Sequence, residues 1–208
     1  YRLGQWDLAE ENFRQSLKIS CETGHQQGEA VALLALGMLC RRRRQFDRAE
    51  EHFRRALELA TKSSALRETL LANEFLGELA LDRNDPATAV QILEPTLARA
   101  IEAAPQGDLT AELETRLGAA YLELGRIDQA REHLLKGVAL AQALGDGIEQ
   151  SLAERQLARI DAVRGDAAAV EAKLRAVAQC FENLHEPYEL ALTLMTWVLT
   201  NSACSKRG

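Results

Sequence analysis

The stretch Trp6-Asp-Leu-Ala-Glu-Glu-Asn-Phe13 returns along the chain as Phe46-Asp-Arg-Ala-Glu-Glu-His-Phe53 and as Ile127-Asp-Gln-Ala-Arg-Glu-His-Leu134. In each copy a small residue lies four positions before a bulky apolar one. The full series of such pairs is Ala9/Phe13, Ala49/Phe53, Ala89/Leu93, Ala130/Leu134 and Val170/Leu174, at spacings of 40, 40, 41 and 40 residues. A fixed period of this length is typical of repeat architectures.

A second signal accompanies the first. Twelve residues before four of the small residues lies another small residue that follows a leucine: Leu36-Gly37, Leu76-Gly77, Leu117-Gly118 and Leu157-Ala158. Apolar side chains around each signal recur at three and four positions, which indicates amphipathic helices. We therefore predict two helices per repeat, called A and B. The A helices are expected at 26–43, 65–83, 107–124, 147–164 and 186–202, and the B helices at 5–22, 46–62, 86–103, 127–144 and 167–184.

Paired helices at a constant period predict an all-α fold. We expect a right-handed α-α superhelix, a solenoid of about five helix-turn-helix repeats in which each repeat contacts its neighbours. Residues 1–208 are interpreted as one solenoid domain. The repeat units are expected at 1–23 (partial), 24–63, 64–104, 105–145 and 146–184, followed by a terminal helix within 185–208.

The small and bulky positions resemble those of the tetratricopeptide repeat, whose small residues let paired helices approach closely. The residues that carry the resemblance are Leu36, Gly37, Cys40, Ala49, Phe53 and Ala56, and again Leu117, Gly118, Tyr121, Ala130, Leu134 and Gly137. The family's usual period is about 34 residues, and each unit here is longer by roughly six. Long repeats of this kind resemble those of multidomain bacterial signalling proteins and transcription regulators.

Composition agrees with stacked helices. The hydrophobic share is 47% but aromatic residues make up only 5%, so the predicted core is rich in leucine and alanine. No apolar run approaches the roughly eighteen residues of a membrane span, and no signal-peptide pattern opens the chain. We therefore expect a cytoplasmic protein without a membrane partner.

The first B helix has no A helix ahead of it in this sequence. It carries Leu3, Trp6 and Phe13, which a preceding helix would cover. The chain is accordingly interpreted as a fragment of a larger protein. Helices left open at the ends of the solenoid would also allow self-association, including a homodimer.

Residues with catalytic or metal-binding chemistry form no motif. The four cysteines, Cys21, Cys40, Cys180 and Cys204, contain no Cys-x-x-Cys pair. His52 and His133 occupy equivalent positions of two B helices, which repeat inheritance explains. No nucleophile elbow, zinc-protease motif or phosphate-binding glycine loop is present. We expect no enzymatic activity, no metal and no cofactor.

The distribution of charged residues gives one candidate binding site. A formal net charge of −6 argues against direct nucleic-acid binding. The exception is Arg41-Arg-Arg-Arg44, together with Arg48, Arg54 and Arg55. One interpretation is a solvated helix end, where cations oppose the helix dipole and pair with Glu50, Glu51 and Glu58. The other is a contact for an anion or an acidic peptide.

The resemblance implies that A helices line a concave groove, at positions three before and one, four and five after the small residue. The predicted groove residues are Leu34, Met38, Arg41 and Arg42, then Glu74, Glu78, Leu81 and Asp82, then Thr115, Ala119, Leu122 and Glu123, and finally Arg155, Arg159, Ala162 and Val163. These charges form bands that would select the register of a partner. The alternative is intramolecular pairing between repeats, such as Arg42 with Glu74 or Glu78.

Two classes of function remain open. The first is a protein-interaction module that binds a peptide or helix of another protein, or another domain of the same chain, in the groove. The second is an effector-sensing domain, which binds a small molecule or peptide and controls an attached output domain. Positions where chaperone-binding relatives carry a lysine, asparagine and arginine clamp hold Leu34, Met38, Glu74 and Glu78, so a co-chaperone role is not expected.

Overall fold

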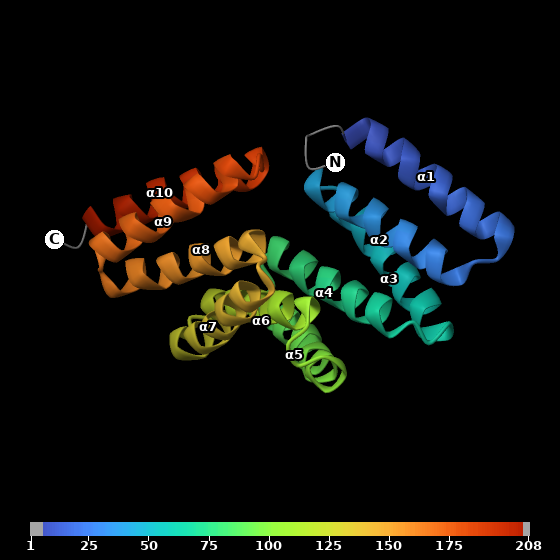
Figure 1. Ribbon diagram of the computed structural model, residues 1–208, viewed down its shortest axis with the longest axis horizontal. Helices are drawn as coiled ribbons and strands as arrows, with labels where there is room; N and C mark the ends of the chain where they lie inside the picture. Colours follow the sequence, from blue (N-terminus) through green and yellow to red (C-terminus); the bar gives the residue numbers. More distant parts are fainter. Residues whose placement is uncertain (1–5, 206–208) are drawn as a thin grey trace. The chain divides into compact units, whose positions relative to one another are not determined.

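A computed structural model describes the backbone of residues 6–205 and the side chains of residues 6–200. This part of the chain contains ten α-helices and no strand (Figure 1). The helices are α1 (Trp6–Thr23), α2 (Gln26–Arg42), α3 (Phe46–Lys62), α4 (Leu66–Asp82), α5 (Pro86–Ala103), α6 (Asp108–Glu123), α7 (Ile127–Leu144), α8 (Gly147–Arg164), α9 (Ala167–Asn183) and α10 (Pro187–Ser205).

The predicted all-α fold of paired helices is confirmed. Even-numbered helices are the A helices and odd-numbered helices the B helices of the sequence analysis. Their ends agree with the prediction to within one residue, except that α10 continues to Ser205, three residues beyond the expected end. The contact of Leu3 with a preceding helix lies outside the described residues.

Eight of the nine turns between the described helices contain a residue in the left-handed region; the turn between α5 and α6 is the exception. This residue is Gly24, Gly125, Gly145 or Gly165 at four turns, with φ between 68° and 82°. Arg44, Ser64, Asn84 and His185 occupy the equivalent place elsewhere, with φ between 56° and 60°. At Arg44 the following Gln45 N–H donates to Cys40 O at 2.8 Å, so the helix ends in a Schellman-type turn.

Close approach of each A helix to its B helix depends on the small residue that the sequence places in the Leu-Gly signal. A methyl group on Gly77 would lie 2.6 Å from Leu93 Cγ, and one on Gly118 would lie 2.6 Å from Leu134 Cγ. Gly37 faces the Phe53 ring in the same way. The bulky anchors Phe53, Leu93, Leu134 and Leu174 are completely buried as a result.

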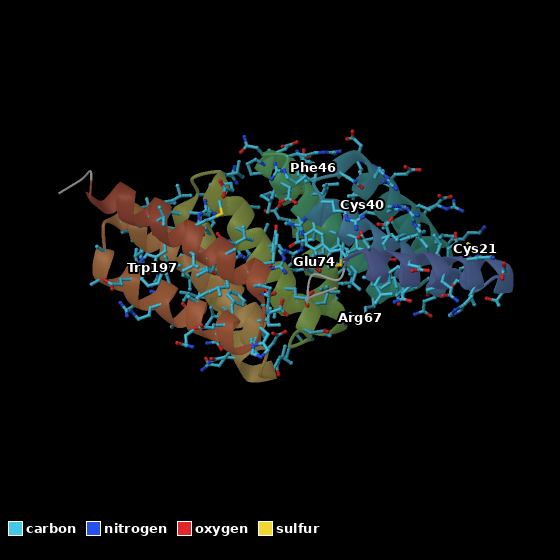
Figure 2. The ribbon with its side chains drawn as sticks, turned by 90° about the horizontal axis from the view of Figure 1, so that it is seen from above. Cys21, Cys40, Phe46, Arg67, Glu74 and Trp197 are labelled. Carbon is cyan, nitrogen blue, oxygen red and sulfur yellow. The ribbon has the colours of Figure 1, made fainter. Side chains whose placement is uncertain are left out.

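The chain divides into two compact units, Tyr1–Ala103 and Ala104–Gly208. The core of the first unit is made of alanine and leucine around Phe53, which packs on the Phe75 ring at 5.4 Å. In the second unit Ala158 and Ala162 of α8 pack on Val170 and Leu174 of α9, with Trp197 of α10 against them (Figure 2). No helix among the described residues is long and apolar enough to cross a membrane.

Candidate functional site

Neighbouring A helices contact each other within each unit. In the described part of the chain α2 contacts α4, while α8 contacts both α6 and α10. The backbones of successive B helices in this part of the chain, such as α1 and α3 or α7 and α9, do not approach each other as closely. The A helices therefore form a continuous layer in each unit, and all the predicted groove residues lie on or at the ends of A helices.

The position three before each small residue is buried. Leu34, Glu74, Thr115 and Arg155 are each less than a tenth exposed. Thr115 donates its hydroxyl to Ala111 O at 3.1 Å, within its own helix. This position therefore lies between helices and contributes little surface to a groove.

Arg41 of the first unit is engaged by α4. Its Nη1 lies 2.5 Å from Glu78 Oε2 and its Nε lies 2.6 Å from Asp82 Oδ2. Met38 packs partly buried against the core of this unit, and Arg42 is partly buried at the end of α2. The structure thus contains intramolecular pairing between repeats of the kind that the sequence left as an alternative, here between Arg41 and the carboxylates of Glu78 and Asp82.

Other members of the arginine cluster also meet carboxylates. Arg43 donates to both Asp7 and Glu10 of α1, and the Asp7 distance is 2.5 Å. Arg54 binds Glu50 at 2.7 Å, and Arg55 binds Glu58 at 2.9 Å. These pairs correspond to the interpretation of the cluster as a solvated helix end.

Arg155 of the second unit forms a buried ion pair. Its Nη1 and Nη2 both lie 3.0 Å from Glu189 Oε2, and Nη1 also donates to Thr193 Oγ1 at 3.3 Å. Its guanidinium lies 5.9 Å from the centre of the Phe181 ring. Arg155 therefore links α8 to α10, and these contacts supply the several partners that a buried charge needs.

Arg159 lies nearer the surface, one turn along α8. Its Nη2 is 2.8 Å from Glu123 Oε1 of α6, and the side chains are 35% and 40% exposed. Its Nη1 donates to Gln156 Oε1 at 2.9 Å. An ion pair this exposed contributes little stability, so solvent or another carboxylate can replace one partner.

Arg155 and Arg159 meet at a pocket of about 790 Å³ between α6, α8 and α10. Its lining contains aliphatic side chains, two arginines and no acidic residue. The lining residues are Leu122, Gly125, Ile127, Arg155, Gln156, Arg159, Ala162, Val163, Leu192, Met195, Thr196, Leu199 and Thr200. Its volume and mostly apolar lining are in the range of ligand-binding pockets in proteins.

Four of these lining residues on α8 and one on α6 are among the groove residues predicted from the sequence, but none on α10 is. Met195 and Leu199 were missed because the last A helix was given no groove positions. The 40-residue register was the available signal, since Arg155 and Arg159 map onto Met195 and Leu199.

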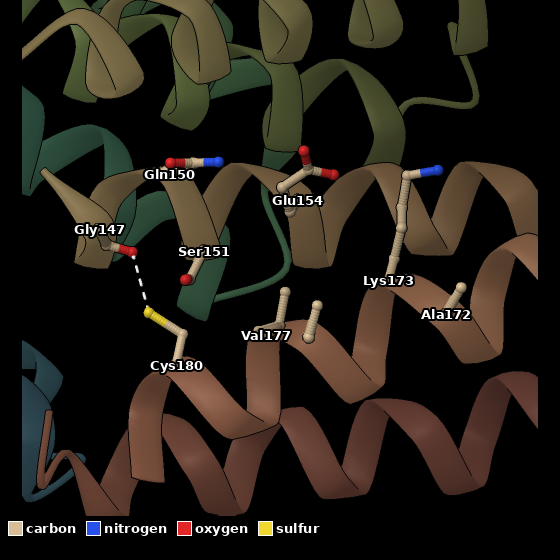
Figure 3. Close-up of a pocket in the computed structure, with 9 residues that line it drawn as sticks. Gly147, Gln150, Ser151, Glu154, Ala172, Lys173, Val177 and Cys180 are labelled. Carbon is tan, nitrogen blue, oxygen red and sulfur yellow. Dashed lines mark hydrogen bonds between the residues drawn. The ribbon is translucent and has the colours of Figure 1, made fainter. Parts of the chain in front are cut away.

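A second, smaller pocket of about 460 Å³ lies between α8 and α9 (Figure 3). Ser151 of α8 faces Cys180 and Val177 of α9 across it, and Glu154 of α8 also lines it. Burial raises the pKa of the Glu154 carboxyl, against the opposing effect of Lys173. The Cys180 thiol donates to Gly147 O at 3.6 Å.

Titratable groups elsewhere are dispersed. Burial lowers the pKa of His52 and raises that of the Cys40 thiol, and both residues line a small pocket of about 140 Å³ between α1, α2 and α3. Among the described residues no three His, Cys, Asp or Glu side chains are grouped so that they could hold a metal ion. His133 Nδ1 of α7 lies 2.5 Å from Glu114 Oε2 of α6. The His133 ring also stacks on the Tyr121 ring, so both contacts join α6 to α7.

Comparison with known proteins gives the family. A family model described as tetratricopeptide repeat matches residues 1–62 and 68–143, well over half of the chain. The chain belongs to the tetratricopeptide repeat family. The fold of this family is a non-enzymatic scaffold for protein interactions. No curated protein matches the chain in sequence.

Solved structures of this tetratricopeptide fold resemble the chain at low identity. BtubC (BKLC) from P. vanneervenii has a TM-score of 0.73 and 15% identity, over 97% of this chain and 85% of that one. Kinesin light chain repeats from Podosopora anserina have a TM-score of 0.60 and 17% identity, over 84% and 90%. A Rap protein in complex with competence and sporulation factor has a TM-score of 0.66 and 12% identity, over 86% and 55%.

Proposed function

We propose that this chain is a protein-interaction module that binds a peptide or helix of its partner on the A-helix face. Within the second unit, the pocket between α6, α8 and α10 is the part of that face that receives partner side chains. The single observation that carries the proposal is this pocket, because it joins exposed aliphatic side chains to two arginines without an acidic residue in its lining.

Exposure supports this assignment. Val163, Met195 and Leu199 line the pocket and are 47%, 60% and 69% exposed. Three large apolar side chains gathered at one hollow form the kind of surface that marks an interaction site. Aliphatic contacts would supply most of the affinity, and Arg159 would select the orientation of the partner.

The first unit has an A-helix face of its own, which we propose contributes differently. Arg41, Glu78 and Asp82 satisfy one another there, so partner contacts at these residues have to compete with existing ion pairs. Met38 and Arg42 are partly buried, and Glu74 is buried. We assign the charged residues of this unit to partner selection, with the smaller share of the affinity.

The wider setting that we propose is the regulatory or scaffolding region of a cytoplasmic bacterial signalling protein or transcription regulator. The resemblance of the long repeats to those of such proteins supports it. A structural neighbour, the Rap protein, is solved in complex with competence and sporulation factor, so a fold of this kind can bind such a factor. The partner is then another protein or another domain of the parent chain.

The alternative function is effector sensing. The specific observation in its favour is the pocket between α8 and α9, which brings Glu154, Lys173 and Ser151 around a space of about 460 Å³ (Figure 3). A small molecule bound there would bias how α8 and α9 pack, and so would be coupled to any attached domain.

A display selection tests the main proposal. The 208-residue chain is panned against a random peptide library, and enriched peptides are titrated against Met195→Glu and against Leu135→Glu. Leu135 is the matched control, because it is also an exposed apolar residue of the second unit, 42% exposed, but lies on the B helix α7.

We expect the enriched peptides to lose at least about tenfold in affinity with Met195→Glu and to keep their affinity with Leu135→Glu. Equal affinity for both variants would refute the pocket as the binding site. Enriched peptides that respond instead to Glu154→Ala would favour the pocket between α8 and α9 and the effector-sensing function.

A further inference from the structure

The exposed side of α10 is unusually apolar. Leu194, Met195, Val198 and Leu199 are 47%, 60%, 66% and 69% exposed, and they recur along two turns at intervals of one, three and four. Glu189 is the only charged residue from Pro187 to Thr200, and it is buried against Arg155. A surface of this kind on a folded protein marks an interaction site.

The shape of this surface is set by the repeat. Ala191, Leu194 and Val198 follow Ser151, Glu154 and Ala158 of α8 by one period of 40 residues. That side of α8 packs on a helix, because Ala158 is buried against Val170 and Leu174 of α9. Figure 3 shows the same side of α8, with Ser151 pointing toward Cys180 of α9. The equivalent side of α10 therefore has the geometry of a helix-binding surface.

One residue distinguishes α10 from the other A helices. Val198 stands where Gly37, Gly77, Gly118 and Ala158 stand in the preceding repeats. A methyl group on Gly77 or Gly118 already lies 2.6 Å from the leucine of the facing B helix. A helix with Phe or Leu at that point cannot approach Val198 as closely, so a helix with the repeat's own pattern, such as α1 of a second copy with Phe13, packs poorly there.

We propose that α10 and the adjoining pocket bind one amphipathic helix of a partner, which offers a small residue opposite Val198 and aliphatic residues on either side of it. This proposal rests on the proposed function and names the class of partner. Met195 and Leu199 join the two surfaces, since both line the pocket between α6, α8 and α10.

Charge adds a second requirement on the partner helix. Arg159 is a partly exposed cation of the adjoining pocket, and its Glu123 partner is 40% exposed. A carboxylate on the partner helix replaces Glu123 at little cost, because both groups already contact water. The pocket lining contains no acid that would repel it. The partner is therefore an amphipathic helix with an acidic residue beside its aliphatic stripe.

The test uses two helical peptides with the α9 sequence, residues 166–184, each held in helical form by a side-chain lactam. One keeps Leu174 and the other carries Leu174→Ala, which makes the residue opposite Val198 small. Binding of each labelled peptide to the 208-residue chain is measured by fluorescence anisotropy. The same titrations are repeated with Leu194→Glu and with the matched control Leu135→Glu.

The expected result is that the Leu174→Ala peptide binds, that the unchanged peptide binds at least about tenfold more weakly, and that only Leu194→Glu abolishes binding. Tighter binding of the unchanged peptide would overturn the role of Val198. Binding of neither peptide, or equal binding to both protein variants, would overturn the helix-binding surface itself.

Val198→Gly supplies a further check on the same surface. It should reverse the preference between the two peptides and let copies of the chain associate through α1, which sedimentation velocity detects. An unchanged preference would contradict the packing argument. Library peptides that need Met195 but do not depend on Leu194 would leave the proposed function standing while this inference fails.

Discussion

Gly118 of α6 faces Leu134 of α7 so closely that a methyl group on Gly118 would lie 2.6 Å from Leu134 Cγ. Both residues are buried, and the leucine is completely so. The glycine therefore sets the distance between the paired helices. Alanine ordinarily favours a helix over glycine by about 1 kcal/mol, so any loss of stability on substitution measures the crowding.

Gly118→Ala is expected to lower the free energy of unfolding by about 1 to 3 kcal/mol, the range for overpacking. Urea denaturation measures the change. A double-mutant cycle with Leu134→Ala is the control, because removing the leucine side chain makes room for the methyl group. An additive cycle would show that the two residues do not act through their contact.

The turn residues with left-handed backbone conformation predict that glycine stabilises the turn and that other residues destabilise it. Ser64 has φ of 56° and is not glycine, whereas Gly145 has φ of 71° in the equivalent turn. Ser64→Gly should raise the free energy of unfolding by about 0.5 to 1 kcal/mol, and Gly145→Ala should lower it by about 1 kcal/mol. A rise with both substitutions, or a fall with both, would contradict the shared role of these positions.

Arg83 ties α4 to the preceding B helix by donating to Asp47 at 2.7 Å and to Glu50. The hydrogen bonds from Arg83 and Arg54 lower the pKa of Glu50. A lowered carboxyl pKa in the folded state gives stability that is present above the unfolded pKa and is lost as pH falls through the folded value.

Arg83→Met should therefore lower stability near neutral pH by less than about 1 kcal/mol, because the pair is largely exposed. The difference from the unsubstituted chain should shrink at high salt, and also as pH falls through the lowered folded pKa of Glu50. Denaturation midpoints measured over a series of pH values from neutral into acid test this, with Arg48→Met as the control on a neighbouring exposed arginine. A difference that persists in acid would assign the loss to packing.

Glu154 gives the reverse dependence on pH. Burial raises the pKa of its carboxyl, so the folded state holds the proton more tightly than the unfolded state does. Stability therefore falls as pH rises from the unfolded pKa through the raised folded value, and the cost is complete above it. Glu154→Gln should raise the denaturation midpoint at about pH 7 and leave it unchanged at about pH 3. A lower midpoint at neutral pH would show that the charge is stabilising, for example through Lys173.

The fold was predictable because two signals in every repeat carry physical constraints. Gly118 and Leu134 must be small and bulky for the helices to meet, so their spacing reports the helix pair directly. Turn residues such as Gly125 and Gly165 then place the helix ends. The predicted end of α10 was three residues too early, because the segment Asn201-Ser-Ala-Cys-Ser205 contains no glycine or proline that would mark the end of the helix.

The candidate site was less predictable. The register identified Arg155 and Glu123 as residues of the A-helix face, but it could not tell a buried tie from an exposed contact. Arg155 pairs with Glu189, and this depends on how far α10 approaches α8, which the sequence alone does not give. Met195 and Leu199 could have been found by carrying the same register one repeat further.

The most direct test of the interaction-module account is site-specific photo-crosslinking in cells that produce the protein. A photoreactive phenylalanine derivative is placed at Met195 in one strain and at Leu135 in another. The account predicts a discrete adduct with another protein or another domain from position 195, weakened by Leu199→Glu, and none from position 135. Adducts of equal yield from both positions, or from position 135 alone, would contradict it.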